Sequence, residues 1–214
     1  MKFAVLLTCC VSPLYCKEDE IRKRKKLYLK VIKKWLKNTE LEIYCVDSSA
    51  YKFDEIKNSR FHIASFLHKN KDKNLGKTQG EIKSLLYAYK YFKKEWKDIG
   101  YTHIIKITGR YYLEDLEQWT IKINKTKNKD LWTQSYCMPF PQSWISYFLS
   151  YQNSEIFVCK ISKLYEMFSK NKNILMERYL YDLEDSGKYK VGKLPKLKNT
   201  LRIKRGDNLV LEHL

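Results

Sequence analysis

The sequence predicts an α/β fold in which a mainly parallel sheet is flanked by helices. Its 214 residues are 44% hydrophobic and 14% aromatic, which is enough apolar material for one sizeable core. Short apolar runs without polar alternation, typical of strands covered on both faces, take turns along the chain with amphipathic segments of helical period. Neither an internal repeat nor a low-complexity linker divides the chain. We therefore expect one domain over residues 1–214, with a basic irregular tail from about residue 187.

The first half of the chain predicts three strands and two helices. The first strand is an apolar run that ends at Thr8. Residues 74–81 predict a glycine-bearing loop, in which Thr78 and Glu81 have the spacing of a capping box for the helix that follows. The predicted elements are strands over residues 3–8, 41–46 and 61–67, and helices over about residues 20–38 and 78–100.

The second half predicts three more strands and three shorter helices. A loop marked by prolines and aromatic residues, at 138–144, is of a kind that often shapes an acceptor pocket, although such loops also cap cores. The predicted elements are strands over residues 101–108, 131–137 and 156–159, and helices that start near 114 and cover about 161–168 and 175–185.

The stretch at residues 101–113 is the strongest indication of a site. It begins as a run of β-branched and aromatic residues, and then a glycine and two cations arrive where the strand leaves the sheet. Ligands of open α/β sheets sit outside the carboxyl ends of the strands, so we expect Lys106, Thr108, Arg110 and Tyr111 to face a crevice. Lysine and arginine there favour an anionic ligand. A plain turn with solvated charges is the alternative.

Two further residues are placed to contribute to such a site. Asp47 follows the second strand, where a carboxylate can accept hydrogen bonds from a nucleoside, although many such aspartates simply begin a turn. Lys77 lies near the amino terminus of the long helix and is placed to assist an anion there. The loop around it lacks the Gly-x-x-x-x-Gly-Lys-Ser/Thr pattern, so it is not a P-loop.

The chain is strongly basic. Lysine and arginine total 42 against 24 acidic residues, a formal charge of +18, which predicts attraction to nucleic acid, anionic lipid or phosphorylated ligands. The lysines are spread over almost every segment, so the charge alone does not choose among these partners. The basic helix at residues 20–38 suits peripheral contact with an anionic membrane, and equally a solvated outer layer of the fold.

The cysteines and the amino terminus indicate a reducing cytoplasmic setting. None of the six cysteines forms a Cys-x-x-Cys pair, and most lie in apolar strand-like runs. The first ten residues have too short an apolar run for a secretion signal, and no segment approaches the roughly 18 apolar residues of a membrane span. We therefore expect a cytoplasmic protein, with peripheral contact at the inner face of the membrane left open.

The order of these pieces resembles small GT-A-type glycosyltransferases of capsule and lipopolysaccharide gene clusters and of some large viruses. The resemblance covers roughly residues 1–185 and rests on Thr8, Asp47, Gly80-Glu81 and the element Lys106-Ile107-Thr108-Gly109-Arg110-Tyr111. It implies a nucleotide-sugar donor, a UDP-sugar as the first guess, bound at the carboxyl ends of the first strands with Thr8 and Asp47 near base and ribose. It also implies a glycan or lipid-linked glycan as acceptor.

The sequence departs from this family at the metal site. Most members carry Asp-x-Asp where Lys106-Ile107-Thr108 stands, and those acids hold Mn²⁺ or Mg²⁺ on the diphosphate. We therefore expect no metal cofactor, with Lys106 and Arg110 neutralising the leaving diphosphate directly. The alternative is Mn²⁺ or Mg²⁺ held by acids elsewhere.

Inverting glycosyl transfer needs a base for the acceptor hydroxyl. In similar enzymes this acid lies late in the fold, which makes Glu177 the first choice and Asp182 the second. Both belong to a richly acidic helix, where a carboxylate is more often solvated surface. A retaining reaction needs no such base, and the sequence leaves the stereochemistry open.

Two other functions compete with this hypothesis. The charge and 17 tyrosines, which are suited to base stacking, favour a basic nucleic-acid-binding module. Against it, the sequence shows no recognition-helix, KH or RRM signature, and we expect no specific nucleic-acid partner. A nucleotidyltransferase of related topology is the third interpretation, but no glycine-rich loop follows the first strand.

Overall fold

The computed structural model describes residues 1–69, 73–126, 128–136, 151–152, 156–170, 176–194, 201–203 and 210–212. Its helices are α1 (Glu18–Asn38), α2 (Lys73–Ile99), α3 (Leu116–Lys125), α4 (Ile161–Phe168) and α5 (Met176–Asp185). Its strands are β1 (Phe3–Cys9), β2 (Ile43–Asp47), β3 (Phe61–Ser65), β4 (His103–Thr108), β5 (Leu131–Thr133), β6 (Ser135–Tyr136), β7 (Tyr151–Gln152), β8 (Ile156–Lys160), β9 (Val191–Lys193), β10 (Leu201–Ile203) and β11 (Val210–Glu212).

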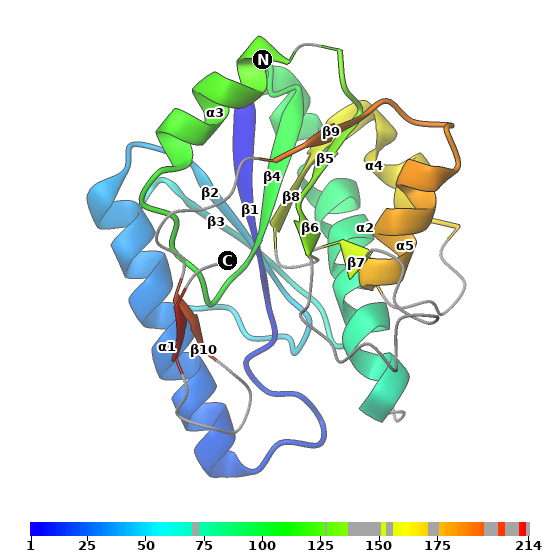
Figure 1. Cartoon of the computed structure of the whole chain (residues 1–214). Coiled ribbons are helices and arrows are strands. Elements are labelled where there is room, and N and C mark those ends of the chain that lie inside the picture. Colours follow the sequence, from blue (N-terminus) through cyan, green and yellow to red (C-terminus); the bar gives the residue numbers. More distant parts are fainter. Residues whose placement is uncertain are drawn as a thin grey trace.

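Seven strands form one sheet in the order β3-β2-β1-β4-β8-β5-β9 (Figure 1). Only β8 runs antiparallel to its neighbours, so the predicted fold class, a mainly parallel sheet flanked by helices, is confirmed. The chain builds outward from β1 through β2 to β3 and then returns to place β4 on the other side of β1. The carboxyl ends of β1 and β4 therefore meet at the point where the strand order reverses, which is where open α/β sheets bind ligands.

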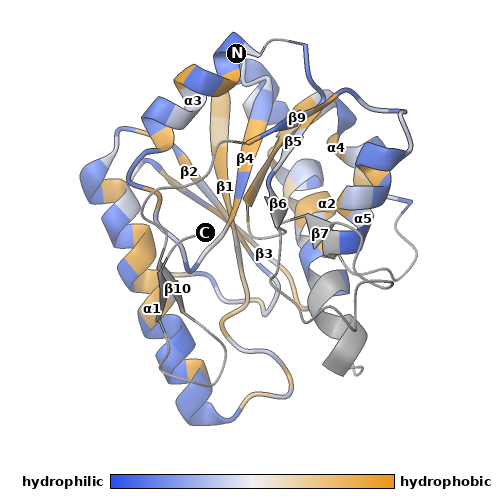
Figure 2. Ribbon diagram, in the orientation of Figure 1, coloured by the Kyte–Doolittle hydropathy of each residue, from blue (hydrophilic) through white to orange (hydrophobic). Residues whose placement is uncertain are grey.

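Helices cover both faces of the sheet, and the strand residues alternate between the two layers. Leu7, for example, packs in the layer of α1 and α3, whereas Leu6 packs in the layer of α2, α4 and α5. Each layer contains a fully buried tryptophan, Trp35 on α1 and Trp96 on α2. Figure 2 shows the apolar strands between helices whose outer sides are hydrophilic. This layering explains why the strands read as apolar runs without alternation.

The start of α2 corrects the prediction for residues 74–81. These residues are helical, because α2 begins at Lys73, so the expected glycine-bearing loop and the Thr78–Glu81 capping box are both wrong. Gly80 has a packing reason to lie within a helix, since a Cβ there would stand 3.2 Å from Cδ2 of His68. Gly80 therefore marks close packing with His68 rather than a turn.

The predicted irregular tail is also partly wrong. β9 pairs in parallel with β5, and β10 pairs with β11, so the region after residue 187 contributes an edge strand and a small two-stranded sheet. Three-residue strands are too short to show a period in sequence. Gly192 also lies so close to Trp132 that a Cβ would approach the indole to 2.7 Å. The loop at 138–144 lies outside the described residues.

The connection between β5 and β8 starts and finishes at the same end of the strands of the large sheet. β5 ends at Thr133, and β8 begins at Ile156, which pairs with Ile107 near the carboxyl end of β4. Between them, β6 and β7 form a separate antiparallel pair. Because β8 runs antiparallel to β4 and β5, both ends of this connection lie where β1 and β4 have their carboxyl ends.

Candidate functional site

The candidate site is built around the carboxyl ends of β1 and β4. Thr8 and Thr108 are partners in the last rung of the ladder between these strands, and the Gly109 N–H then donates to the Thr8 carbonyl at 2.9 Å. A Cβ on Gly109 would stand 2.2 Å from the Cys9 sulfur. Glycine is therefore required because the two chains approach closely here, and this approach sets Arg110 at the edge of the sheet.

Asp47 organises the loops beside this edge. Its side chain is fully buried, and Oδ2 accepts a hydrogen bond from the Val11 N–H at 3.0 Å. Oδ1 accepts three more, from Ser49 N–H at 2.7 Å, Ser49 Oγ at 2.6 Å and Tyr51 N–H at 3.0 Å. Most of the acceptor capacity of the carboxylate is thus used within the protein, to hold the turns after β1 and β2 together. Contact of Asp47 with a nucleoside stays a prediction.

Lys106 does not face an open crevice, contrary to expectation. It shares the face of β4 that carries Ile104 and Thr108, so its side chain enters the apolar layer under α2 and is completely buried. There Nζ pairs with Glu81 of α2, donates to Thr108 Oγ1 at 3.2 Å and lies 5.6 Å from the centre of the Phe157 ring. A buried ammonium group requires a counter-charge. Glu81, explained from the sequence as a cap, provides it.

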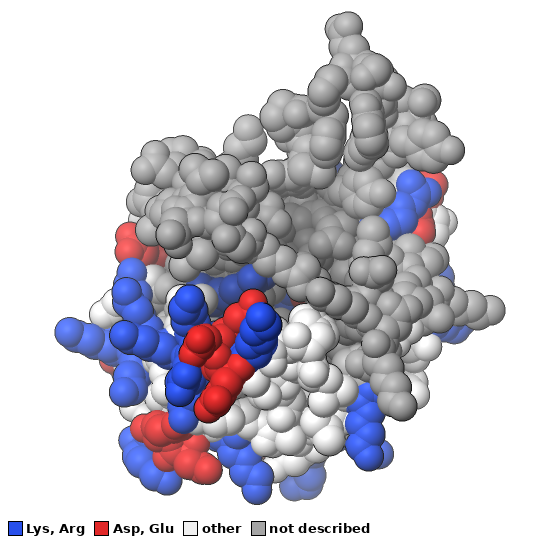
Figure 3. Space-filling model, turned by 90° about the horizontal axis from the view of Figure 1, so that it is seen from below, with Lys and Arg blue, Asp and Glu red and all other residues white. Residues whose placement is uncertain are grey.

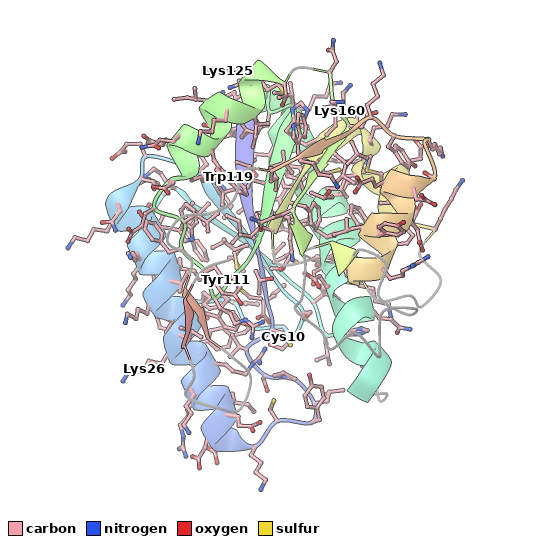
Figure 4. All side chains as sticks on the ribbon, viewed as in Figure 1. Cys10, Lys26, Tyr111, Trp119, Lys125 and Lys160 are labelled. Atoms are coloured by element: carbon pink, nitrogen blue, oxygen red, sulfur yellow. The ribbon has the colours of Figure 1, made fainter. Side chains whose placement is uncertain are left out.

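Tyr111 is also a core residue rather than a crevice residue. Its side chain is 3% exposed and packs in the α1 layer, where Figure 4 places it between α1 and the sheet. Its backbone is fixed as well, because its N–H donates to the Thr108 carbonyl at 3.0 Å and its carbonyl accepts from Trp35 Nε1 at 3.0 Å. The expectation that Tyr111 faces a ligand is therefore wrong. The buried ring and the two backbone hydrogen bonds of Tyr111 instead anchor the turn that follows β4.

Two arginines gather at the end of β1. Arg24 of α1 donates to the Cys10 carbonyl from Nε at 2.9 Å and from Nη2 at 2.6 Å, and Nη2 also reaches the Tyr28 hydroxyl at 3.2 Å. Arg110 is half-buried, with its guanidinium carbon 5.8 Å from the Tyr111 ring centre. Burial raises the pKa of Tyr28 above its ordinary value, while the positive charges of both arginines oppose this. Arg24 therefore contacts the buried Tyr28 hydroxyl directly, whereas Arg110 acts on it only through its charge.

Arg24 was missed by the sequence reasoning. It lies four residues before Tyr28, so both project from the same side of α1, and Tyr28 is buried. A cation on the apolar side of an otherwise solvated basic helix is the signal that could have identified it. Together, Arg24 and Arg110 supply planar guanidinium groups of the kind that bind phosphate oxygens.

Cysteines beside this edge have no features of a nucleophile. Cys10, labelled in Figure 4 at the end of β1, is half-buried, and burial raises the pKa of its thiol. Cys9 and Cys45 are buried with their sulfur atoms 3.6 Å apart, and burial raises the pKa of Cys9 as well. Thiols held in the neutral form are poor nucleophiles.

The remaining predicted residues lie on the other helical layer. Asp182 accepts from Arg178 Nε at 2.8 Å in a partly exposed pair within α5, and no contact in the described part of the chain links it to Thr8 or Arg110. Glu177 stands in the first turn of α5, which packs beside β7 (Figure 1). Lys77 lies in the second turn of α2. The side chains of Glu177 and Lys77 are outside the described residues.

The residues at the Asp-x-Asp position do not fit a divalent cation. Lys106 has no lone pair to offer a metal, and it is already paired with Glu81. Across the described ranges, no three His, Cys, Asp or Glu side chains stand close enough to hold a metal ion. A metal-free site stays a prediction. Of the helices in the described ranges, none has the length and apolarity needed to span a membrane.

Solved structures of several transferases have a similar fold. No protein-family model and no curated protein matches the sequence. The bifunctional IspDF from Campylobacter jejuni matches with a TM-score of 0.56 and 8% identity, over 91% of this chain and 49% of that one. The chain thus spans about half the length of IspDF.

Two further structures match over most of both chains. A CMP:2-keto-3-deoxy-manno-octonic acid synthetase in complex with CTP has a TM-score of 0.51 and 7% identity, over 91% of this chain and 90% of that one. A proposed nucleotide-diphospho-sugar transferase from Desulfovibrio desulfuricans G20 has a TM-score of 0.51 and 12% identity, over 91% and 80%. At such identities the likeness establishes the fold alone.

Proposed function

We propose that the protein is a glycosyltransferase that binds a nucleotide-sugar donor at the carboxyl ends of β1 and β4. The observation that carries this proposal is the position of two arginines at the point where the strand order reverses: Arg24 is held by the Cys10 carbonyl, and half-buried Arg110 directly follows Gly109, which bonds to the Thr8 carbonyl. The similar structures support it, since one is a complex with CTP and another is described as a nucleotide-diphospho-sugar transferase.

The arginines supply electrostatic stabilisation. As the bond between sugar and phosphate breaks, negative charge grows on the leaving nucleoside diphosphate, and fixed positive groups lower the barrier by stabilising that charge. Arg110 makes this contact, and Arg24, already held by the Cys10 carbonyl, adds its field. Lys106 acts indirectly, because its ammonium group holds the Thr108 hydroxyl in place from inside the layer under α2.

The acceptor binds on the side of β6, β7 and α5. Glu177 is the preferred base, since it stands in the first turn of α5, the helix that packs beside β7. Asp182 is less suited because it is engaged by Arg178 on the surface. A glycan hydroxyl is the group that this base would deprotonate.

Nucleotidyl transfer is the second candidate, because the CTP-bound synthetase has the same fold. Such a reaction needs donors around a triphosphate, which glycine-rich loops supply through backbone N–H groups. Here the loop after β1 contains no glycine, and its Val11 and Ser12 N–H groups donate inward, to Asp47 and to Ser49 Oγ. These two groups are therefore not available to phosphate, which favours glycosyl transfer.

Donor binding tests the proposal. We expect UDP- or other nucleoside-diphosphate sugars to raise the melting temperature, and Arg110→Met to weaken binding about 10- to 100-fold, the loss of a charge-assisted hydrogen bond. Arg178→Met, which removes a guanidinium from the surface of α5, is the matched control and should bind normally. Equal affinity of Arg110→Met and the wild type would reject the site.

Product analysis separates the two reactions and tests the metal. A glycosyltransferase releases nucleoside diphosphate from the donor, whereas a nucleotidyltransferase releases pyrophosphate from a nucleoside triphosphate. We expect turnover to survive EDTA. Activity that EDTA abolishes and Mn²⁺ restores would show that acids elsewhere hold a metal.

A further inference from the structure

The outer face of α1 carries a continuous row of cations. With 3.6 residues per turn, their positions fall within an arc of about 120° on the side opposite the buried Tyr28 and Trp35. No acidic residue occurs between positions 21 and 38 of this helix. We call this row the basic stripe, and its exposed members are Arg22, Lys23, Lys26, Lys30, Lys33, Lys34 and Lys37.

Most of the basic stripe is not neutralised by the protein. Two members are paired: Arg22 with Glu18 and Asp19, and Lys34 with Glu114 at 3.0 Å. The other five members are all lysines, and none has an ion-pair or hydrogen-bond partner among the residues that the structure describes. Figure 4 shows Lys26 projecting away from the sheet. These five are Lys23, Lys26, Lys30, Lys33 and Lys37.

We propose that the basic stripe docks the protein on an anionic lipid bilayer. A helix of 21 residues is about 30 Å long, and charges confined to one side of it reach a flat surface together. Lysine is a hydrated point charge, which suits the diffuse field of lipid headgroups better than the planar recognition of phosphates that favours arginine. Nucleic acid fits less well, because the aromatic residues of α1, Tyr28 and Trp35, are buried and cannot stack on bases.

The loop that leads into α1 adds apolar contact at one end of the stripe. Leu14 is 61% exposed and Tyr15 is 42% exposed, shortly before the first turn of α1, which carries the acidic residues Glu18, Asp19 and Glu20. Apolar and tyrosine side chains of this kind bury themselves at the boundary between headgroups and acyl chains. Figure 3, viewed from the lower end of Figure 1, shows cations on the side of α1 together with the acidic residues of its first turn. The loop also follows β1, so docking keeps the candidate site close to the lipid surface.

The opposite layer provides a matched control. The outer side of α2 also exposes lysines, but Asp98 stands beside them, and Lys94 pairs with Asp98 at 3.3 Å. The exposed lysines of α2 used in the control are Lys83, Lys90, Lys93 and Lys97. Replacing four lysines by glutamine on either helix removes the same charge, so only the location differs.

Vesicle sedimentation tests this proposal with the full chain. We expect binding to vesicles of phosphatidylcholine with 30% phosphatidylserine, at about 0.1 M salt, and little binding to phosphatidylcholine alone. The variant K26Q/K30Q/K33Q/K37Q should lose on the order of several hundred-fold in partitioning, about fivefold for each lysine. K83Q/K90Q/K93Q/K97Q should lose less than about fivefold, and melting temperatures confirm that both variants fold.

Three outcomes would overturn it. Absence of binding to the anionic vesicles removes the docking function, and equal loss in the two variants shows attraction by net charge alone. The third is binding of single- or double-stranded oligonucleotides that depends on the α1 lysines in the absence of vesicle binding, which would assign the stripe to nucleic acid. None of these outcomes affects the donor-binding test on Arg110, so the two proposals fail separately.

Discussion

Replacing Gly109 by alanine tests why the turn after β4 contains glycine. The new Cβ would stand 2.2 Å from the Cys9 sulfur, and also 3.3 Å from the Thr8 carbonyl oxygen and from Cδ1 of Tyr28. Carbon and sulfur do not approach so closely, so one chain must shift by roughly 1 Å. Cys9 is 4% exposed on a central strand and cannot swing away. We expect a loss of about 2–3 kcal/mol, the upper part of the range for overpacking.

A double-mutant cycle isolates the clash. Cys9→Ala alone removes one buried sulfur and should cost about 1 kcal/mol. In Gly109→Ala/Cys9→Ala the methyl group occupies the space that the sulfur left, so we expect the two changes to be coupled favourably by about 1–2 kcal/mol. Urea unfolding followed by tryptophan fluorescence gives each free energy of unfolding.

A second glycine supplies the control. Gly100 has a φ of +83° and no atom within 4 Å of an added Cβ, so Gly100→Ala is destabilised by backbone strain, about 1 kcal/mol, and not by a clash. Cys9→Ala should not rescue it. If the Gly109 and Cys9 changes prove additive within about 0.5 kcal/mol, the close approach of β1 and β4 does not explain the glycine.

Two other predictions concern buried titratable side chains, Lys106 and His103. Lys106→Met leaves Glu81 in the layer under α2 without its ammonium partner and should cost about 3–5 kcal/mol in urea unfolding, most of it recovered in Lys106→Met/Glu81→Gln; no recovery would contradict the pairing. Burial against Phe3 and Trp132 lowers the pKa of His103 to about 4, so its neutral ring is favoured in the folded state. The unfolded chain has a His103 pKa near 6.5, so below that pH it binds a proton that the folded protein does not. The free energy of unfolding therefore has its full value above about pH 6.5 and falls by about 3 kcal/mol as pH falls toward 4. His103→Gln should flatten the pH dependence of stability in that window, and an unchanged slope would refute the assignment.

The parts of the fold that the sequence predicted well are those with strong local signals. The helix predicted over 161–168 is α4, and the apolar runs that became β1 and β4 were placed within one or two residues. The failures occurred where a tertiary contact decided the outcome. Gly80 lies in a helix because His68 packs against it, and β9 exists because β5 offers it a paired edge. Neither partner is close in sequence.

The candidate site shows the same division. Parallel strands present their carboxyl ends together, so Thr8 and Thr108 meet at one edge of the sheet, while their role in donor binding stays a prediction. The crevice predicted around Lys106 is wrong. Lys106 lies two residues after the buried Ile104 and so points to the same face of β4. Its burial is tolerated because Glu81, on α2, supplies a counter-charge that the sequence around β4 does not reveal. Tyr111 was misplaced for a related reason, since its partner Trp35 lies 76 residues away.

The reversed strand β8 has a consequence for how this protein can diversify. Since β5 ends and β8 begins at one rim of the sheet, the stretch between them can change in length or sequence without disturbing any of the seven paired strands. Under the proposed function, a change in this insert would alter the acceptor side while the carboxyl ends of β1 and β4 stay unchanged.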